Sequence, residues 1–155
     1  MTMQILNYFL ASIIAYLGLL LGIFLIKLAP EEQKPGKTYF LLLKKITFFL
    51  VIGFMLFFYN INFILLVALL FFIVILMINK KLNLEKSSLT YFFLGIVFFL
   101  SSKILNLFVI ESVLIFLYGI LSASLIIDLK KKNYKDVFLK NIWFFVPVVL
   151  LYFIL

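Results

Sequence analysis

The sequence predicts an all-α protein, a polytopic bundle of transmembrane helices, and three observations support this prediction. Apolar residues make up 67% of the 155-residue chain and charged residues 13%, whereas soluble domains contain roughly 45 to 50% apolar residues. The apolar residues form stretches that are long enough to cross a bilayer. All but one of the lysines lie in clusters between these stretches, at 27–45, 80–86 and 130–140.

The first predicted helix covers Ile5–Ile26 and ends at Lys27. At 1.5 Å per residue, a helix of this length crosses a hydrocarbon core of about 30 Å. It is therefore expected to be a membrane span.

Segment 29–37 is the most polar part of the chain and is expected to be a loop. Its Pro35-Gly36 pair is typical of a type II turn, because proline presets φ and glycine accepts a positive φ. Glu31 and Glu32 favour a short helical turn after Pro30.

The uncharged stretch Ile46–Ile78 would be roughly 50 Å long as one helix, which is too long for a single crossing. We therefore expect two spans, one from Tyr39 to a turn at Tyr59–Asn62 and one over Ile61–Ile78. Two spans also return the chain to the side that holds the first lysine cluster, as the positive-inside rule requires.

The stretch Leu89–Ile127 is again long enough for two spans. The polar residues Asn106 and Glu111 predict the break between them. The fourth span is then Leu89 to about Leu105, and the fifth is Ser112–Ile127.

The sixth span is predicted from about Val137 to Leu155. Pro147 lies inside it and cannot donate a hydrogen bond to the Trp143 carbonyl. We therefore expect a kink in this helix.

The six spans form one predicted membrane domain, 1–155, of three tandem helical hairpins: 5–59, 61–105 and 112–155. Segment 43–50 aligns without gaps to segment 139–146, which suggests internal repetition. A chance match in a chain with 21 phenylalanines is the alternative.

The lysine clusters predict a multi-pass protein of the cell membrane, with the basic loops in the cytoplasm and both termini outside. The formal charge of +8 is expected to orient the chain and to attract anionic membrane lipids. Binding to nucleic acid is not expected, because no separate domain carries the basic residues.

Residue types that carry most enzyme chemistry are missing. The chain has no cysteine and no histidine, and it has no arginine. Thiolate metal sites, imidazole bases and bidentate phosphate clamps are thereby excluded. The remaining carboxylates fall in predicted loops, with none at mid-span, so we expect no catalytic site, no metal site and no cofactor.

Small residues form a stripe along one face of the first span, a pattern that lets membrane helices approach closely. The stripe consists of Ala11, Ala15, Gly18 and Gly22, and the fifth span has a shorter counterpart in Ser112, Gly119 and Ala123. Two interpretations are open. The stripe packs against the fifth span inside the monomer, or it is a surface for a partner membrane protein or a second copy.

Lys103 and Glu111 form a candidate polar cluster at the outer side. A structural ion pair across the turn is the simpler interpretation, since charges in spans are costly and usually pair. A polar vestibule for an ion, solute or headgroup is the alternative. The other members of this candidate cluster are Ser101, Ser102, Asn106, Tyr16 and Tyr118.

Tyr16 and Tyr118 lie near mid-span, where a hydroxyl needs a hydrogen-bond partner. Ser12 and Ser122 on neighbouring turns are the expected partners. The other tyrosines fit aromatic belts at the two membrane surfaces: Tyr8, Tyr59 and Tyr152 in the outer belt, and Tyr39, Tyr91 and Tyr134 in the inner one.

From these features we expect a small, non-enzymatic membrane subunit or scaffold, which assembles with itself or with other membrane proteins through the first span. The alternative is a small transport or solute-binding component that uses the cluster around Lys103 and Glu111. A transporter should contain a water-accessible cavity lined by Tyr16, Tyr118, Ser101 and Lys103, whereas a scaffold should have a filled core.

Overall fold

The computed structural model describes residues 5–60, 87–126 and 134–154, and within them it is helical apart from short turns, with no strand. The all-α prediction is confirmed for this part of the chain. The third predicted span and the second lysine cluster lie outside the described residues. The elements are α1 (Ile5–Leu28), η1 (Pro30–Glu32), α2 (Gln33–Phe58), α4 (Ser87–Ser101), α5 (Leu105–Ile126), α6 (Tyr134–Asn141), η2 (Ile142–Phe144) and α7 (Phe145–Ile154).

Within the described ranges, three helices are long and apolar enough to cross a membrane: Ile5–Leu28, Pro30–Phe58 and Leu105–Leu125. Two shorter apolar helices cover Ser88–Ser101 and Phe138–Ile154. Six spans and an arrangement in hairpins remain predictions.

The connection between α1 and α2 differs from the predicted loop. Pro30 begins the short helix η1, as expected. However, Pro35 and Gly36 lie in the first turn of α2, and no described glycine has a positive φ. The predicted type II turn is therefore wrong. Pro35 fits in the first helical turn, because backbone N–H groups there have no carbonyl partner within the helix.

The break between α4 and α5 lies at residues 102–104, so the predicted break at Asn106 and Glu111 is wrong. Two serines account for the difference. The Ser101 and Ser102 hydroxyls donate to the carbonyl oxygens of Phe98 and Phe99, at 2.7 and 2.6 Å. Such back-bonding satisfies carbonyls at the end of a helix, and α5 then begins at Leu105.

The kink predicted in the last span stays a prediction, but the helix type changes just before Pro147. The 3₁₀ turn η2 separates α6 from α7 and ends at Phe144. Pro147 lies one turn later, where its ring would clash with the Trp143 carbonyl in a regular α-helix.

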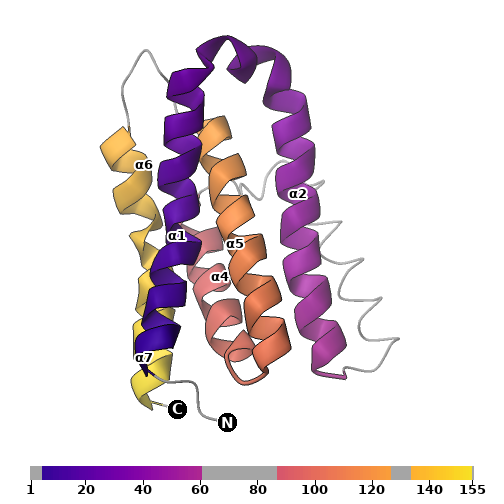
Figure 1. The fold of residues 1–155 in the computed structure, drawn as a ribbon, viewed down its shortest axis with the longest axis vertical. Coiled ribbons are helices and arrows are strands. Elements are labelled where there is room, and N and C mark those ends of the chain that lie inside the picture. The colour runs from indigo at the N-terminus through magenta and orange to yellow at the C-terminus, as the bar shows by residue number, and fades with distance from the viewer. Residues whose placement is uncertain (1–4, 61–86, 127–133, 155) are drawn as a thin grey trace.

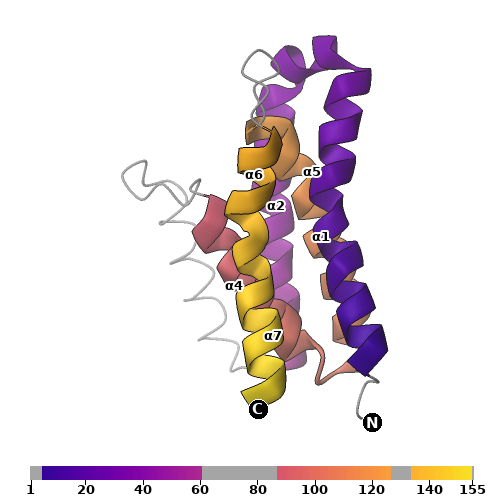
Figure 2. The same ribbon diagram turned by 90° about the vertical axis from the view of Figure 1, so that its left-hand side faces the viewer.

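The bundle is organised around α5, which lies between α1 and α2 (Figure 1). On its other side, α4 packs against α5 and also against η2 and α7 (Figure 2). Among the described helices, α5 therefore packs most against α1 and α2, which are distant from it in the sequence. The start of α1, the end of α7 and the α4–α5 turn lie at one end of the bundle, and η1 lies at the other (Figure 1).

The core is aromatic. Tyr8, Tyr91, Phe98 and Phe144 are its largest fully buried side chains, and their rings make edge-on, tilted and stacked contacts with rings on other helices. Aromatic pairs in such geometry contribute about 0.5 to 1.5 kcal/mol each beyond the burial of their surface.

Candidate functional site

The small-residue stripe of α1 packs against α5 within the chain. A side chain at Gly18 would collide with the backbone of Phe116, and one at Gly22 would lie 2.7 Å from the Ala123 Cβ. Gly119 of α5 is equally close to α1, since its Cβ would lie 2.9 Å from the Leu19 nitrogen. Of the two interpretations of the stripe, the intramolecular one is the one the structure shows.

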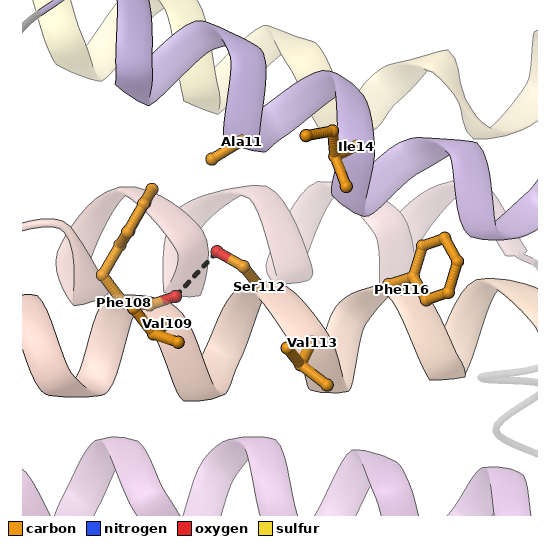
Figure 3. A pocket seen from close by; sticks show the side chains of 7 residues that line it. All are labelled: Ala11, Ile14, Phe108, Val109, Ser112, Val113 and Phe116. Atoms are coloured by element: carbon orange, nitrogen blue, oxygen red, sulfur yellow. Dashed lines mark hydrogen bonds between the residues drawn. The ribbon is translucent and has the colours of Figure 1, made fainter.

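Ala15 is also buried in this α1–α5 contact, whereas Ala11 lines a groove at its edge. The groove measures about 320 Å³, and its walls come from α1 and α5 (Figure 3). Its lining residues are Ala11, Ile14, Phe108, Val109, Ser112, Val113 and Phe116.

This groove is apolar. Its one hydroxyl, on Ser112, donates to the Phe108 carbonyl at 2.7 Å (Figure 3). Ile14, Val109 and Val113 are more than half exposed, so the groove opens at the outer surface of the bundle. It contains none of the polar residues predicted to line a transport cavity.

Lys103 and Glu111 do not form the predicted ion pair. Both carboxylate oxygens of Glu111 are buried and have no hydrogen-bond partner among the described residues. The Lys103 amine lies over the Phe99 ring, 5.0 Å from its centroid, and the side chain is exposed. The pair fails because the turn comes earlier than predicted, which places Lys103 in the turn and Glu111 inside α5.

The remaining members of the predicted polar cluster do not converge on Glu111 either. Ser101 and Ser102 use their hydroxyls at the end of α4, and Asn106 is exposed on the first turn of α5. These three residues shape the turn and form no common site.

Tyr16 is buried but its hydrogen bond was predicted incorrectly. Its hydroxyl donates to the Phe138 carbonyl of α6 at 2.6 Å. Ser12 bonds instead to the Phe9 carbonyl of its own helix at 2.8 Å. The hydroxyl of Tyr16 therefore links α1 to α6 by a hydrogen bond.

Tyr118 lies on the core face of α5, between Tyr91 of α4 and Phe48 of α2, with ring centroids 5.8 and 5.9 Å away. The Lys44 amine lies 5.4 Å from the centre of its ring, a cation–π arrangement. The predicted bond to Ser122 is not made, and the Ser122 hydroxyl has no hydrogen-bond partner in the described part of the chain.

Two tyrosines assigned to the aromatic belts belong to the core. Tyr8 is fully buried and donates to the Val148 carbonyl of α7 at 3.0 Å. Tyr91 is 1% exposed and lies between Tyr16 and Tyr118. In contrast, Tyr39 and Tyr59 are exposed, as a belt position requires.

Sequence reasoning missed two features. One is the depth of Glu111, which lies on a buried stripe of α5 with Leu107, Ile115, Tyr118 and Ser122. The spacing of these residues, four, four, three and four positions apart, was a visible helical signal. The other is the face of α2 that is exposed at the surface of the bundle, where apolar residues also recur every three or four positions.

That outward face consists of Leu43, Ile46, Leu50, Gly53 and Phe57, which follow a heptad pattern. The four large side chains are each at least 41% exposed. At Gly53, an added Cβ would meet no described atom within 4 Å. We call these five residues the α2 stripe.

Comparisons with protein-family models, with curated proteins and with solved structures found no match.

Proposed function

We propose that the chain is a small, non-enzymatic integral membrane subunit that assembles through the α2 stripe. The single observation that carries this proposal is an exposed apolar face with heptad spacing and a glycine within it. Heptad spacing keeps one seam of a helix facing a partner helix, and a glycine lets the two backbones approach. The sequence predicted an assembly surface on α1. The α2 stripe takes its place in this proposal, because Gly18 and Gly22 of α1 pack against α5 of the same chain.

Burial distinguishes α2 from the other long helices. Only 17% of the most apolar part of Pro30–Phe58 is buried inside the structure, compared with 44% for α1 and 50% for Leu105–Leu125. Lipid can cover such a face. The regular spacing of the stripe, however, favours another helix as its neighbour.

The occupant that we propose is the α2 helix of a second copy. Two identical stripes can meet across a twofold axis, which is the commonest symmetry of homo-oligomers. No component other than this chain is then needed, so purified protein suffices for the test.

The core of the described residues favours a subunit over a transporter. Tyr16, Tyr118 and Ser101 are buried among packed side chains, and Lys103 is outside this core. The small transport or solute-binding function remains a second candidate, because the buried carboxyl of Glu111 is unexplained by packing.

We test assembly by native mass spectrometry of the full chain in lipid. Leu50→Trp and Gly53→Leu should reduce the dimer, because both add bulk to the seam. Leu21→Trp is the matched control, since Leu21 on α1 and Leu50 on α2 are 42% and 41% exposed. It should leave the dimer unchanged.

A monomer that carries no other membrane protein would contradict the proposal. If the parent instead purifies with a different membrane protein that Leu50→Trp releases, the partner is heterologous and self-association is wrong.

We also propose that both termini lie outside the cell and that the lysine-rich loops face the cytoplasm. The start of α1, the end of α7 and the α4–α5 turn share one end of the bundle, which supports this orientation. The chain lacks cysteine, so single cysteines report cleanly. An impermeant thiol reagent applied to intact cells should label Lys103→Cys and leave Lys37→Cys unlabelled; the reverse result would contradict the orientation.

A further inference from the structure

Glu111 is a fully buried acid inside an apolar helix. It lies six residues, about 9 Å, from the start of α5. Its exposed fraction is 0%, and neither carboxylate oxygen has a hydrogen-bond partner within the described residues. Most buried polar groups in proteins are hydrogen-bonded, so an exception needs an explanation.

The helix α1 offers no compensating group at this level. Gly18 lies against Phe116 and Gly22 against Ile120, so the two helices run parallel. Continuing this register toward their N-terminal ends brings Ile13 level with Glu111, and the adjacent Ser12 is the polar residue of α1 at this level. The Ser12 hydroxyl is already donated to the Phe9 carbonyl.

Of the described helices, the others that pack on α5 also lack a countercharge there. The sequence of α2 is uncharged from Ile46 to Phe58, and that of α4 is uncharged throughout. Tyr8 is the titratable residue of α1 nearest this level, since its ring lies 6.2 Å from that of Phe108, but its hydroxyl donates to the Val148 carbonyl. The other titratable groups on these helices are Tyr16 and Lys27 of α1, Lys34, Lys37, Tyr39, Lys44 and Lys45 of α2, and Tyr91 of α4.

An ionised carboxylate is very unfavourable in such surroundings, so it takes up a proton or acquires a partner. Tyr91 and Ser122 provide a useful contrast. Their hydroxyls are also buried without a hydrogen-bond partner among the described residues, but a hydroxyl carries no charge. Glu111 is the one acid of α5, so its burial is the more costly of the two cases.

We propose that Glu111 is a proton-binding site within the membrane, with its carboxyl group protonated in the packed state. No hydrogen bond in the structure requires an acid at this position, so packing alone does not account for it. Proton exchange occurs from the end of the bundle that holds the α4–α5 turn, where Lys103 and Asn106 are exposed polar residues. This inference is independent of the α2 stripe.

The test uses the full chain in liposomes and the hydrophobic reagent N,N′-dicyclohexylcarbodiimide. A protonated carboxyl adds to the carbodiimide, and rearrangement leaves a stable N-acylurea that retains every atom of the reagent. Peptide mass spectrometry should locate this adduct on Glu111 at neutral pH, and labelling should decrease as the pH is raised. Glu31 and Glu32, which are exposed, should react at least tenfold more slowly.

Glu111→Gln should abolish the adduct, and Glu31→Gln is the control that should preserve it. Infrared spectroscopy gives a second measurement that needs no reagent. The carbonyl band of a protonated carboxylic acid should be present at neutral pH in the parent and in Glu31→Gln, and missing in Glu111→Gln.

Two results would overturn the proposal. If the folded parent shows neither an adduct at Glu111 nor the acid band, the carboxylate is ionised and paired. If sodium at constant pH protects Glu111 from the reagent, the site binds a metal cation and not a proton alone.

Discussion

The helices α1 and α2 are similar in length, 24 and 26 residues, yet they use their glycines in opposite ways. Gly18 and Gly22 of α1 meet the backbone of α5, whereas Gly53 of α2 has no described atom near its missing Cβ. Since a glycine lowers the stability of an isolated helix by about 1 kcal/mol relative to alanine, each position needs a reason. For α1 the reason is internal packing, and for α2 we propose a partner.

A small-residue stripe identifies a helix that approaches another backbone closely, but it does not identify the neighbouring helix. The neighbour of α1 is α5, far away in sequence. Only the packed bundle distinguishes a contact within the chain from a contact between chains.

The largest effect should come from bulk at Gly18. We expect Gly18→Leu to lower the free energy of unfolding by about 3 kcal/mol or more, because the new side chain meets the Phe116 backbone, which cannot move aside cheaply. Gly53→Leu is the matched variant and should leave the monomer folded. Denaturant unfolding in detergent measures both, and equal destabilisation by the two variants would break the distinction between α1 and α2.

A smaller loss of stability is expected when the tyrosine hydrogen bonds of the two helices are removed, and its size should differ between them. Tyr8 of α1 donates to the Val148 carbonyl in the buried core, whereas Tyr59 after α2 donates to the Leu100 carbonyl at the surface. We expect Tyr8→Phe to cost about 1 kcal/mol of stability and Tyr59→Phe much less, because water can replace an exposed bond. Thermal unfolding of the two variants should show this order; the opposite order would contradict the assignment of Tyr8 to the core.

Alanine substitutions should change monomer stability in opposite directions at the exposed Gly53 and at the packed Gly22. Gly53→Ala should stabilise the monomer by up to about 1 kcal/mol through helix propensity alone. Gly22→Ala should destabilise it, because the added methyl group would lie 2.7 Å from the Ala123 Cβ. If both variants stabilise the monomer, the α1–α5 contact is looser than described.

The smallest expected effect is a coupling energy near zero between Lys103 and Glu111. Neither side chain is the partner of the other, so Lys103→Met and Glu111→Gln should be additive within about 0.5 kcal/mol. A double-mutant cycle on stability in detergent is the measurement. A larger coupling would restore the ion pair and remove the unpaired acid from the core.

The position of α1 could be predicted from the sequence, because its apolar length and Lys27 near its end follow local rules. The prolines gave a mixed result, since Pro30 begins η1 as expected whereas the turn predicted at Pro35 lies inside α2. Tyr8 could not be assigned correctly. A belt position is predicted from how far along the span a residue lies, whereas burial depends on whether its side chain faces lipid or another helix. The α4–α5 break was misplaced because several polar residues were eligible, and the serine back-bonds that decide it are visible only in the folded chain.

The most direct test of the account asks whether α1 contacts α5 of the same chain. Ala11→Cys and Ser112→Cys place two thiols in one groove (Figure 3), in a chain without native cysteine. A short bifunctional thiol reagent should link them within one chain, so that the product remains monomeric on a denaturing gel and its linked peptides come from residues 11 and 112. The control pair, Ala11→Cys with Gly53→Cys, should not be linked within a chain, since α5 separates the helices. Predominantly dimeric products from the first pair would show that α1 faces another copy and would contradict the account.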